Sequence, residues 1–170
     1  MIGSDMAIVA LGSNLGDSPR NVVRAAGRLW DFTSVPLLRS SLWLTTPVDC
    51  PPDSPPFVNA VIALKPMPGT TPESLLAVMQ ALEKEFGRVP KKVVNEARPL
   101  DLDLITFGNE TRNLPNLFLP HIRATERRFV MQPLNEIAPD LILPGQTKTV
   151  SQLLALLPPD EAMRRVEWPG

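Results

Sequence analysis

The chain has 170 residues, a formal net charge of -1 and a single cysteine. This length suits one domain with its own core, so we expect one domain over residues 1–170. The near-zero charge excludes an overall basic field for nucleic acid, and no apolar run approaches the ~20 residues of a membrane span. One cysteine excludes an internal disulfide. We therefore expect a cytoplasmic monomer that binds small molecules, with no nucleic acid and no membrane among its partners.

Apolar and alternating runs predict three strands in the first half of the chain. They cover residues 7–11, 37–46 and 57–65. A turn with two glycines follows at residues 12–17, and a tight turn is its simpler interpretation because it matches no standard phosphate-binding motif. Ser18 is a candidate N-cap for a helix over residues 19–31. A proline-rich loop over residues 47–56 separates the second and third strands.

The second half predicts a further strand between helices. Thr70 and Glu73 have capping-box spacing at the start of a helix that ends at Gly87. A basic loop over residues 88–97 leads to an alternating strand over residues 98–105. We expect helices over residues 125–134 and 150–157, with a short edge strand over 141–145. These elements predict an α+β fold with a ferredoxin-like, antiparallel or mixed sheet and helices packed mainly on one face.

Two aspartates interrupt the apolar pattern of the strand over residues 98–105. Alternation places three leucines on the core face and both Asp101 and Asp103 on the open face. The two carboxylates are then roughly 6–7 Å apart and repel each other unless a cation lies between them. Mg²⁺ is the usual ion for such oxygen ligands, although paired aspartates on a solvated strand are also common without a metal.

Basic residues are concentrated on both sides of this strand. They are Lys84, Arg88, Lys91, Lys92 and Arg98 before it, and Arg112, Arg123, Arg127 and Arg128 after it. A metal ion can bridge phosphate oxygens, and planar guanidinium groups bind the remaining oxygens in pairs. The combination indicates a site for a polyphosphate.

Other polar positions have both a structural and a functional interpretation. Asn59 is a polar residue in an apolar strand, and hydrogen bonds to neighbouring backbone explain it as well as ligand binding does. His121 is the only histidine, and a lone histidine is more often structural than catalytic. Gln80 and Glu83 lie one helical turn apart, where solvent exposure is the default.

Several stretches together resemble the 6-hydroxymethyl-7,8-dihydropterin pyrophosphokinase family. They occur in order between residues 7 and 145, at positions 10–16, 45–48, 57–60, 87–89, 98–103, 120–129 and 133–139. The R-x-x-D-x-D pattern at Arg98 and the H-x(5)-R-x-F pattern at His121 are weak singly but specific together. The resemblance therefore covers most of the chain.

The resemblance implies transfer of pyrophosphate from ATP to the hydroxymethyl group of the pterin, with release of AMP, in tetrahydrofolate biosynthesis. Asp101 and Asp103 would bind two Mg²⁺ ions, and the catalytic set would also include Arg88 and Arg98. The implied ATP-binding residues are Gln80, Glu83, Arg88, Lys91, Arg98, His121 and Arg127. The implied pterin-binding residues are Thr45, Val48, Phe57, Asn59, Asp101 and Phe129, with the two phenylalanines stacking on the ring.

The chain departs from the family pattern in its loops. Pro90 stands where a basic residue is frequent, residues 95–98 replace a frequent Trp-Gly-Pro-Arg, and Asp49 replaces a frequent glycine. We expect the loops over residues 48–56 and 88–97 to act as lids. Two other functions stay open: a different Mg²⁺-dependent, nucleotide-using enzyme with a D-x-D metal site, and a non-enzymatic ferredoxin-like ligand-binding module.

Overall fold

The computed structural model describes residues 3–45, 55–87, 97–160 and 162–168. Its main sheet has the strand order β5-β1-β4-β3-β8, every neighbouring pair is antiparallel, and β2 also pairs with β4. These strands are β1 (Ala7–Ser13), β2 (Leu38–Arg39), β3 (Leu42–Thr45), β4 (Phe57–Leu64), β5 (Asp101–Phe107) and β8 (Arg164–Val166). The predicted α+β fold with an antiparallel sheet is confirmed.

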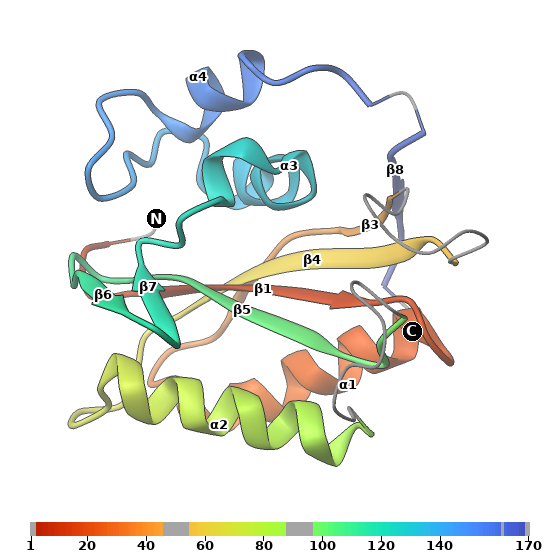
Figure 1. Cartoon of the computed structure of the whole chain (residues 1–170), viewed down its shortest axis with the longest axis horizontal. Helices are drawn as coiled ribbons and strands as arrows, with labels where there is room; N and C mark the ends of the chain where they lie inside the picture. Colours follow the sequence, from red (N-terminus) through yellow and green to blue (C-terminus); the bar gives the residue numbers. More distant parts are fainter. Residues whose placement is uncertain (1–2, 46–54, 88–96, 161, 169–170) are drawn as a thin grey trace.

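Helices cover both faces of the sheet (Figure 1). One face carries α1 (Ser18–Leu29) and α2 (Pro72–Glu85), and the other carries α3 (Arg128–Ile137) and α4 (Val150–Ala155). This corrects the expectation of helices mainly on one face. The physical reason is that β1 and β4 bury apolar residues on both sides, so each face needs its own hydrophobic core.

Two helix starts differ by one residue from the sequence prediction. Asp17 rather than Ser18 caps α1. The capping box of α2 joins Thr71 to Ser74, because Pro72 takes the first helical position and fixes where the helix begins. None of the helices in the described part of the chain has the length and apolar character that a membrane span needs.

The predicted strand over residues 37–46 is divided into β2 and β3. Ser40 lies between them, and its Oγ accepts a hydrogen bond from Val61 N at 2.9 Å in place of a backbone carbonyl. Residues 141–145, predicted as an edge strand, form none. Leu143 instead packs into the core under α3 and α4, and Val150 N donates to Leu141 O at 2.8 Å.

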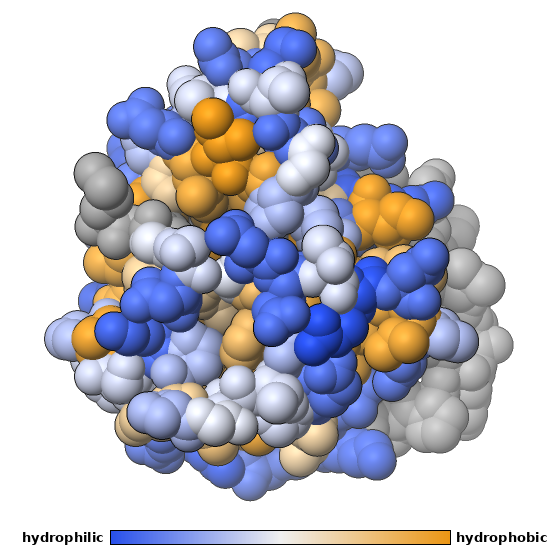
Figure 2. Space-filling view, turned by 90° about the vertical axis from the view of Figure 1, so that its left-hand side faces the viewer, coloured by the Kyte–Doolittle hydropathy of each residue, from blue (hydrophilic) through white to orange (hydrophobic). Residues whose placement is uncertain are grey.

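A separate hairpin, β6 (Arg112–Leu114) and β7 (Leu117–Leu119), follows β5. It exposes Leu114 and Phe118. Figure 2, which views this side of the molecule, shows apolar side chains in small groups among polar ones. The described residues on this side therefore form separate apolar groups (Figure 2).

Candidate functional site

One row of residues crosses four strands of the sheet. The ladders pair Trp43 with Asn59, Asn59 with Gly12, and Gly12 with Asp101. Residues directly opposite each other in antiparallel strands point to the same face. Ala10, two residues before Gly12, packs in the core with residues of α3, so the row lies on the α3 face. It lies beyond the helix-covered core, at the end where β5 begins.

The β4 part of this row has a polar side chain with a defined partner. Asn59 is 7% exposed, and its Nδ2 donates to Thr45 Oγ1 at 2.7 Å. The ring of Phe57 and the side-chain oxygen of Asn59 both lie next to the Cα of Gly12. The structure thus brings together three of the predicted pterin-binding residues, which are Thr45, Phe57 and Asn59.

Asp101 and Asp103 lie on the same face of β5, as predicted, and Leu102 between them is buried. Arg98 Nη1 donates to Asp101 Oδ1 at 3.0 Å, and Arg127 Nη1 lies 4.0 Å from Asp103 Oδ2. Burial first, and then the charge of Asp101, raises the pKa of Asp103 to about 6. A divalent cation would relieve this repulsion between two carboxylates, so the pair fits such an ion.

Within residues 3–45, 55–87, 97–160 and 162–168, no group of three or more His, Cys, Asp or Glu side chains is arranged to hold a metal ion. Asp101 and Asp103 can supply two carboxylates. Mg²⁺ commonly takes one or two carboxylates and completes its shell with water and substrate phosphates. The donor set therefore fits Mg²⁺ that binds together with a polyphosphate, rather than a metal held by protein alone.

A side chain from α2 caps the outer edge of β5, which is the terminal strand of the sheet. Glu83 is 7% exposed, and its Oε2 accepts from Leu102 N at 2.9 Å. Its charge also contributes to the raised pKa of Asp103, although less than burial and Asp101 do. Gln80, one turn earlier on α2, is exposed. Glu83 therefore lies beside the carboxylate pair and holds the strand that carries it.

His121 is held next to β5 by its backbone, since its amide donates to Ile105 O at 2.8 Å. The peptide bond Leu119–Pro120 that precedes it is cis. His121 Nδ1 accepts from Arg123 N at 3.2 Å, so the neutral ring carries its proton on Nε2. Burial, and then the charge of Arg127, lowers the pKa of His121 below its ordinary value. The ring is therefore a neutral Nε2–H donor near pH 7.

Arg127, from the H-x(5)-R-x-F pattern, lies close to the aspartates of the R-x-x-D-x-D pattern. Besides lying near Asp103, its guanidinium lies over the ring of Phe129, 5.5 Å from the centroid. Phe129 is in the first turn of α3 and packs at the edge of the core on that face. The predicted residues Arg88, Lys91 and Val48, and most of both predicted lids, lie outside the described residues.

Two residues that position this site, Asn14 and Trp43, were not predicted from the sequence. Asn14, only 1% exposed, accepts from Arg98 N at its Oδ1 at 2.8 Å and donates from Nδ2 to Pro55 O at 3.3 Å. It therefore connects the segments that precede β4 and β5. The sequence signal that could have identified Asn14 is its position as a polar residue directly after a buried strand. Trp43 was also missed, and only the strand register places it in the row with Asn59.

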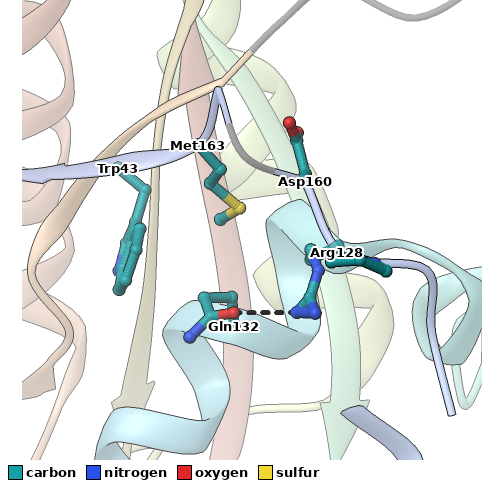
Figure 3. Close-up of a pocket in the computed structure, with 6 residues that line it drawn as sticks. Trp43, Arg128, Gln132, Asp160 and Met163 are labelled. Carbon is teal, nitrogen blue, oxygen red and sulfur yellow. Dashed lines mark hydrogen bonds between the residues drawn. The ribbon is translucent and has the colours of Figure 1, made fainter. Parts of the chain in front are cut away.

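A pocket of about 300 Å³ lies next to Trp43, between β3, the N-terminal half of α3 and the C-terminal segment (Figure 3). Its lining residues are Trp43, Arg128, Gln132, Pro159, Asp160 and Met163. Arg128 Nη1 donates to Gln132 Oε1 at 2.9 Å on one side of the pocket. Open space therefore separates this part of α3 from β3.

Paired carboxylates, two arginines and a neutral histidine around one edge strand define an α+β protein with a site suited to a phosphate-rich ligand. The family model described as 7,8-dihydro-6-hydroxymethylpterin-pyrophosphokinase (HPPK) matches residues 8–139. The chain belongs to this family.

Two relatives carry the name 2-amino-4-hydroxy-6-hydroxymethyldihydropteridine pyrophosphokinase. The protein from Pseudomonas aeruginosa is 42% identical over 154 residues, which cover 88% of this chain and 90% of the relative. The protein from Synechocystis is 34% identical over 148 residues, covering 87% of this chain and 74% of the relative. Each alignment therefore spans most of this chain and most of the relative.

Some matching proteins are much longer. The chain is 35% identical to the folic acid synthesis protein fol1 of Pneumocystis carinii but covers 19% of it. The crystal structure of wild-type Plasmodium falciparum HPPK-DHPS with pteroate matches with a TM-score of 0.68 and 14% identity, over 88% of this chain and 42% of that chain. At this identity the structural match supports the fold alone.

Proposed function

We propose that the protein transfers pyrophosphate from ATP to the hydroxymethyl group of 6-hydroxymethyl-7,8-dihydropterin, giving the pterin diphosphate and AMP, in folate biosynthesis. Family membership and the names of the relatives support this reaction. The observation that carries the proposal is the meeting of Asp101 and Asp103 with Arg98 and Arg127 at the start of β5. Carboxylates for a metal and guanidinium groups for phosphate are what pyrophosphoryl transfer requires.

Asp101 and Asp103 would hold Mg²⁺, with two ions in the complete complex. When bound, Mg²⁺ neutralises phosphate charge and lowers the pKa of the attacking hydroxyl. Arg98 lies against Asp101, where its charge can stabilise the transferring group. Arg88 is proposed for the same role from its family position. The remaining requirement is alignment of the two substrates, because phosphoryl transfer is mainly positioning and charge stabilisation.

The proposed phosphate contacts come from His121 and Arg127, in the segment between β7 and α3. Arg127 can bind two oxygens with its planar guanidinium, and His121 can donate one hydrogen bond from Nε2. Gln80, Glu83 and Lys91 are proposed at the nucleotide from their family positions. The bond of Glu83 to Leu102 N means that this carboxylate also has a structural partner.

The pterin is proposed to bind over the Thr45, Phe57 and Asn59 end of the row. Asn59 and Thr45 offer donor and acceptor groups for the amide edge of the pterin. Phe57 and Phe129 can stack on its two faces, and Val48 and Asp101 complete the proposed set. A D-x-D transferase for another nucleotide substrate would not need Asn59 between stacking aromatics, whereas a non-enzymatic module predicts that function does not depend on Asp101 or Asp103.

We further propose that the whole chain works as a single domain and a monomer in the cytoplasm, with the loops over residues 48–56 and 88–97 closing on the substrates. Size-exclusion chromatography tests the monomer. Hydrogen exchange with and without a non-hydrolysable ATP analogue tests the loops. Equal protection of both loops in the two conditions would contradict closure.

The decisive experiment is incubation of the protein with ATP, Mg²⁺ and the reduced pterin, followed by separation of the nucleotides. AMP and the pterin diphosphate are expected, whereas ADP or inorganic phosphate would redirect the assignment. Asp103→Ala should abolish turnover while the protein still binds the pterin. Near-normal activity of this variant would count against the metal role of the carboxylates.

A further inference from the structure

We propose that Glu136 is a positioning residue that sets the geometry of the pterin pocket, an inference that rests on the proposed function. Glu136 lies in the last turn of α3, and its carboxylate binds Ser41, directly before β3, and Trp43 on β3. Oε1 accepts from Ser41 N at 3.0 Å and from Trp43 Nε1 at 2.6 Å, and Oε2 accepts from Ser41 Oγ at 2.8 Å. Hydrogen bonds to an ionised acceptor are stronger than neutral ones, so this end of the helix is firmly attached.

The same carboxylate also reaches the C-terminal strand. Arg165 Nη1 on β8 lies 3.7 Å from Glu136 Oε2, and the Glu136 side chain is 22% exposed. Arg165 is paired with Trp43 in the β3–β8 ladder. Glu136 therefore connects α3, β3 and β8 at one point, with Ser41 and Trp43 supplying the hydrogen-bond donors.

The two ends of α3 lie over different strands. Arg127, at its N-cap, lies near Asp103 on β5, whereas Glu136 binds β3, and β1 and β4 run between these two strands. Phe129 and Glu136 are seven residues apart, about two helical turns, so their side chains project from the same side of the helix. The attachment at Glu136 therefore acts together with the buried residues Val130, Met131 and Leu134 to set the rotation of α3 and the placement of Phe129.

The strand contacted by Glu136 carries the opposite side of the proposed pterin pocket. Side chains alternate between the two faces of an extended chain, so Ser41, Trp43 and Thr45 project from the same face. Thr45 accepts the hydrogen bond from Asn59. The carboxylate of Glu136 thus links the helix that carries Phe129 to the strand that carries Thr45.

Packing fixes α3 over the middle of the sheet, where Val130, Met131 and Leu134 share a core with β1 and β4, but contact is less complete towards β3. Between Trp43 on β3 and Gln132 on α3, one turn before Glu136, lies the open pocket of about 300 Å³ (Figure 3). Side chains that do not touch across a cavity cannot fix the distance between their elements. The hydrogen bonds of Glu136 therefore supply a direct link between the last turn of α3 and the start of β3, on the side where the pocket leaves the packing open.

The test is steady-state kinetics of Glu136→Ala and Glu136→Gln with the pterin and ATP varied in turn. Glu136→Ala should raise KM for the pterin about tenfold and leave KM for ATP within about twofold. Glu136→Gln should recover most of the pterin affinity, because its amide oxygen can accept from Trp43 and its NH₂ can donate to Ser41 Oγ. A residue that only supported the fold would not affect one substrate selectively.

The matched control is Glu85→Ala, which removes a carboxylate paired with Arg28 on the other face of the sheet. It should leave both KM values unchanged. If Glu136→Ala does not fold, Ser41→Ala removes only the Oγ donor, and a pterin-selective rise of about threefold is expected.

An unchanged pterin KM in the folded Glu136→Ala variant, or equal losses for both substrates, overturns the positioning role. The same holds for an unchanged pterin KM in Ser41→Ala. Absence of AMP with the unsubstituted protein would instead refute the proposed function, so the two failures are distinguishable.

Discussion

Gly12 and Asn59 face each other in the β1–β4 ladder, and the space between them has no room for a side chain at residue 12. A Cβ on Gly12 would lie 2.9 Å from Asn59 Oδ1 and 3.7 Å from the ring of Phe57. The glycine is therefore required by the neighbouring pterin-site side chains and not by its own backbone conformation. This explains a glycine inside a strand, where it otherwise weakens the structure.

Gly12→Ala should weaken pterin binding about tenfold, because Asn59 must move and its bond to Thr45 is strained. Isothermal titration with the pterin measures the loss. Gly27→Ala is the control, since a Cβ there meets nothing within 4 Å. It should leave binding unchanged and stabilise α1 by roughly 0.5–1 kcal/mol. Equal pterin affinity of the two variants would contradict the crowding at Gly12.

Asn14→Ala should lower kcat about tenfold or more while leaving pterin affinity nearly unchanged. The reason is that Asn14 Oδ1 and its backbone amide bind the amide and the carbonyl of Arg98, at 2.8 and 3.0 Å. Loss of the side chain leaves the partly buried amide of Arg98 unpaired and loosens the position of Arg98, whose side chain is 14% exposed and contacts Asp101. Rapid-quench measurement of AMP checks this, with the exposed Asn113→Ala as control.

Asp103→Asn should raise the melting temperature in EDTA at pH 8 by about 2–4 °C, although it removes a metal ligand. The pKa of Asp103 in the folded protein, about 6, lies above its ordinary value of 3.8. The folded state therefore binds more protons between these values, and stability falls as pH rises through this window. The effect is moderate because the side chain is 34% exposed to solvent.

The advantage of this variant should shrink as pH falls from 6 towards 4, where the wild-type carboxyl is protonated in the folded state. Thermal melts across this range follow the trend. Mg²⁺ added together with a non-hydrolysable ATP analogue should stabilise the wild type more than Asp103→Asn, since only the former keeps both carboxylates. If Asp103→Asn were less stable than the wild type at pH 8 in EDTA, the ionised carboxylate of Asp103 would not destabilise the folded state.

His121 should titrate below 6.5, its ordinary pKa, because burial and the charge of Arg127 disfavour the imidazolium. As the only histidine, it has NMR signals that need no assignment. Nitrogen chemical shifts should report a proton on Nε2 in the neutral ring. Arg127→Gln should move the midpoint upwards. A midpoint above 6.5 in the unsubstituted protein would be inconsistent with this environment.

The local pattern of the sequence was sufficient to predict that Asp101 and Asp103 lie on the same face of a strand. A strand places alternate residues on one face regardless of its neighbours, so Asp101 and Asp103 had to share a side once residues 98–105 were recognised as extended. The predicted strand over residues 37–46 is divided into β2 and β3, but the other strands and the helices of the first half followed from the same periodicities. Their ends were displaced by a residue where Pro72 and Asp17 decided the caps.

Contacts between distant segments were decided only by the tertiary structure. Asn14 binds Arg98 across 84 positions and Glu136 binds Ser41 across 95. Neither pair leaves a periodic signal, because these partners meet only after the sheet and α3 have packed. The pairing of β8 with β3 was likewise not predictable from local pattern, and neither was the covering of both sheet faces by helices. Strand pairing and layer packing both depend on burial between distant segments. The sequence by itself determined the chemistry available at β5, and the packing of the folded chain determined which side chains hold that chemistry in place.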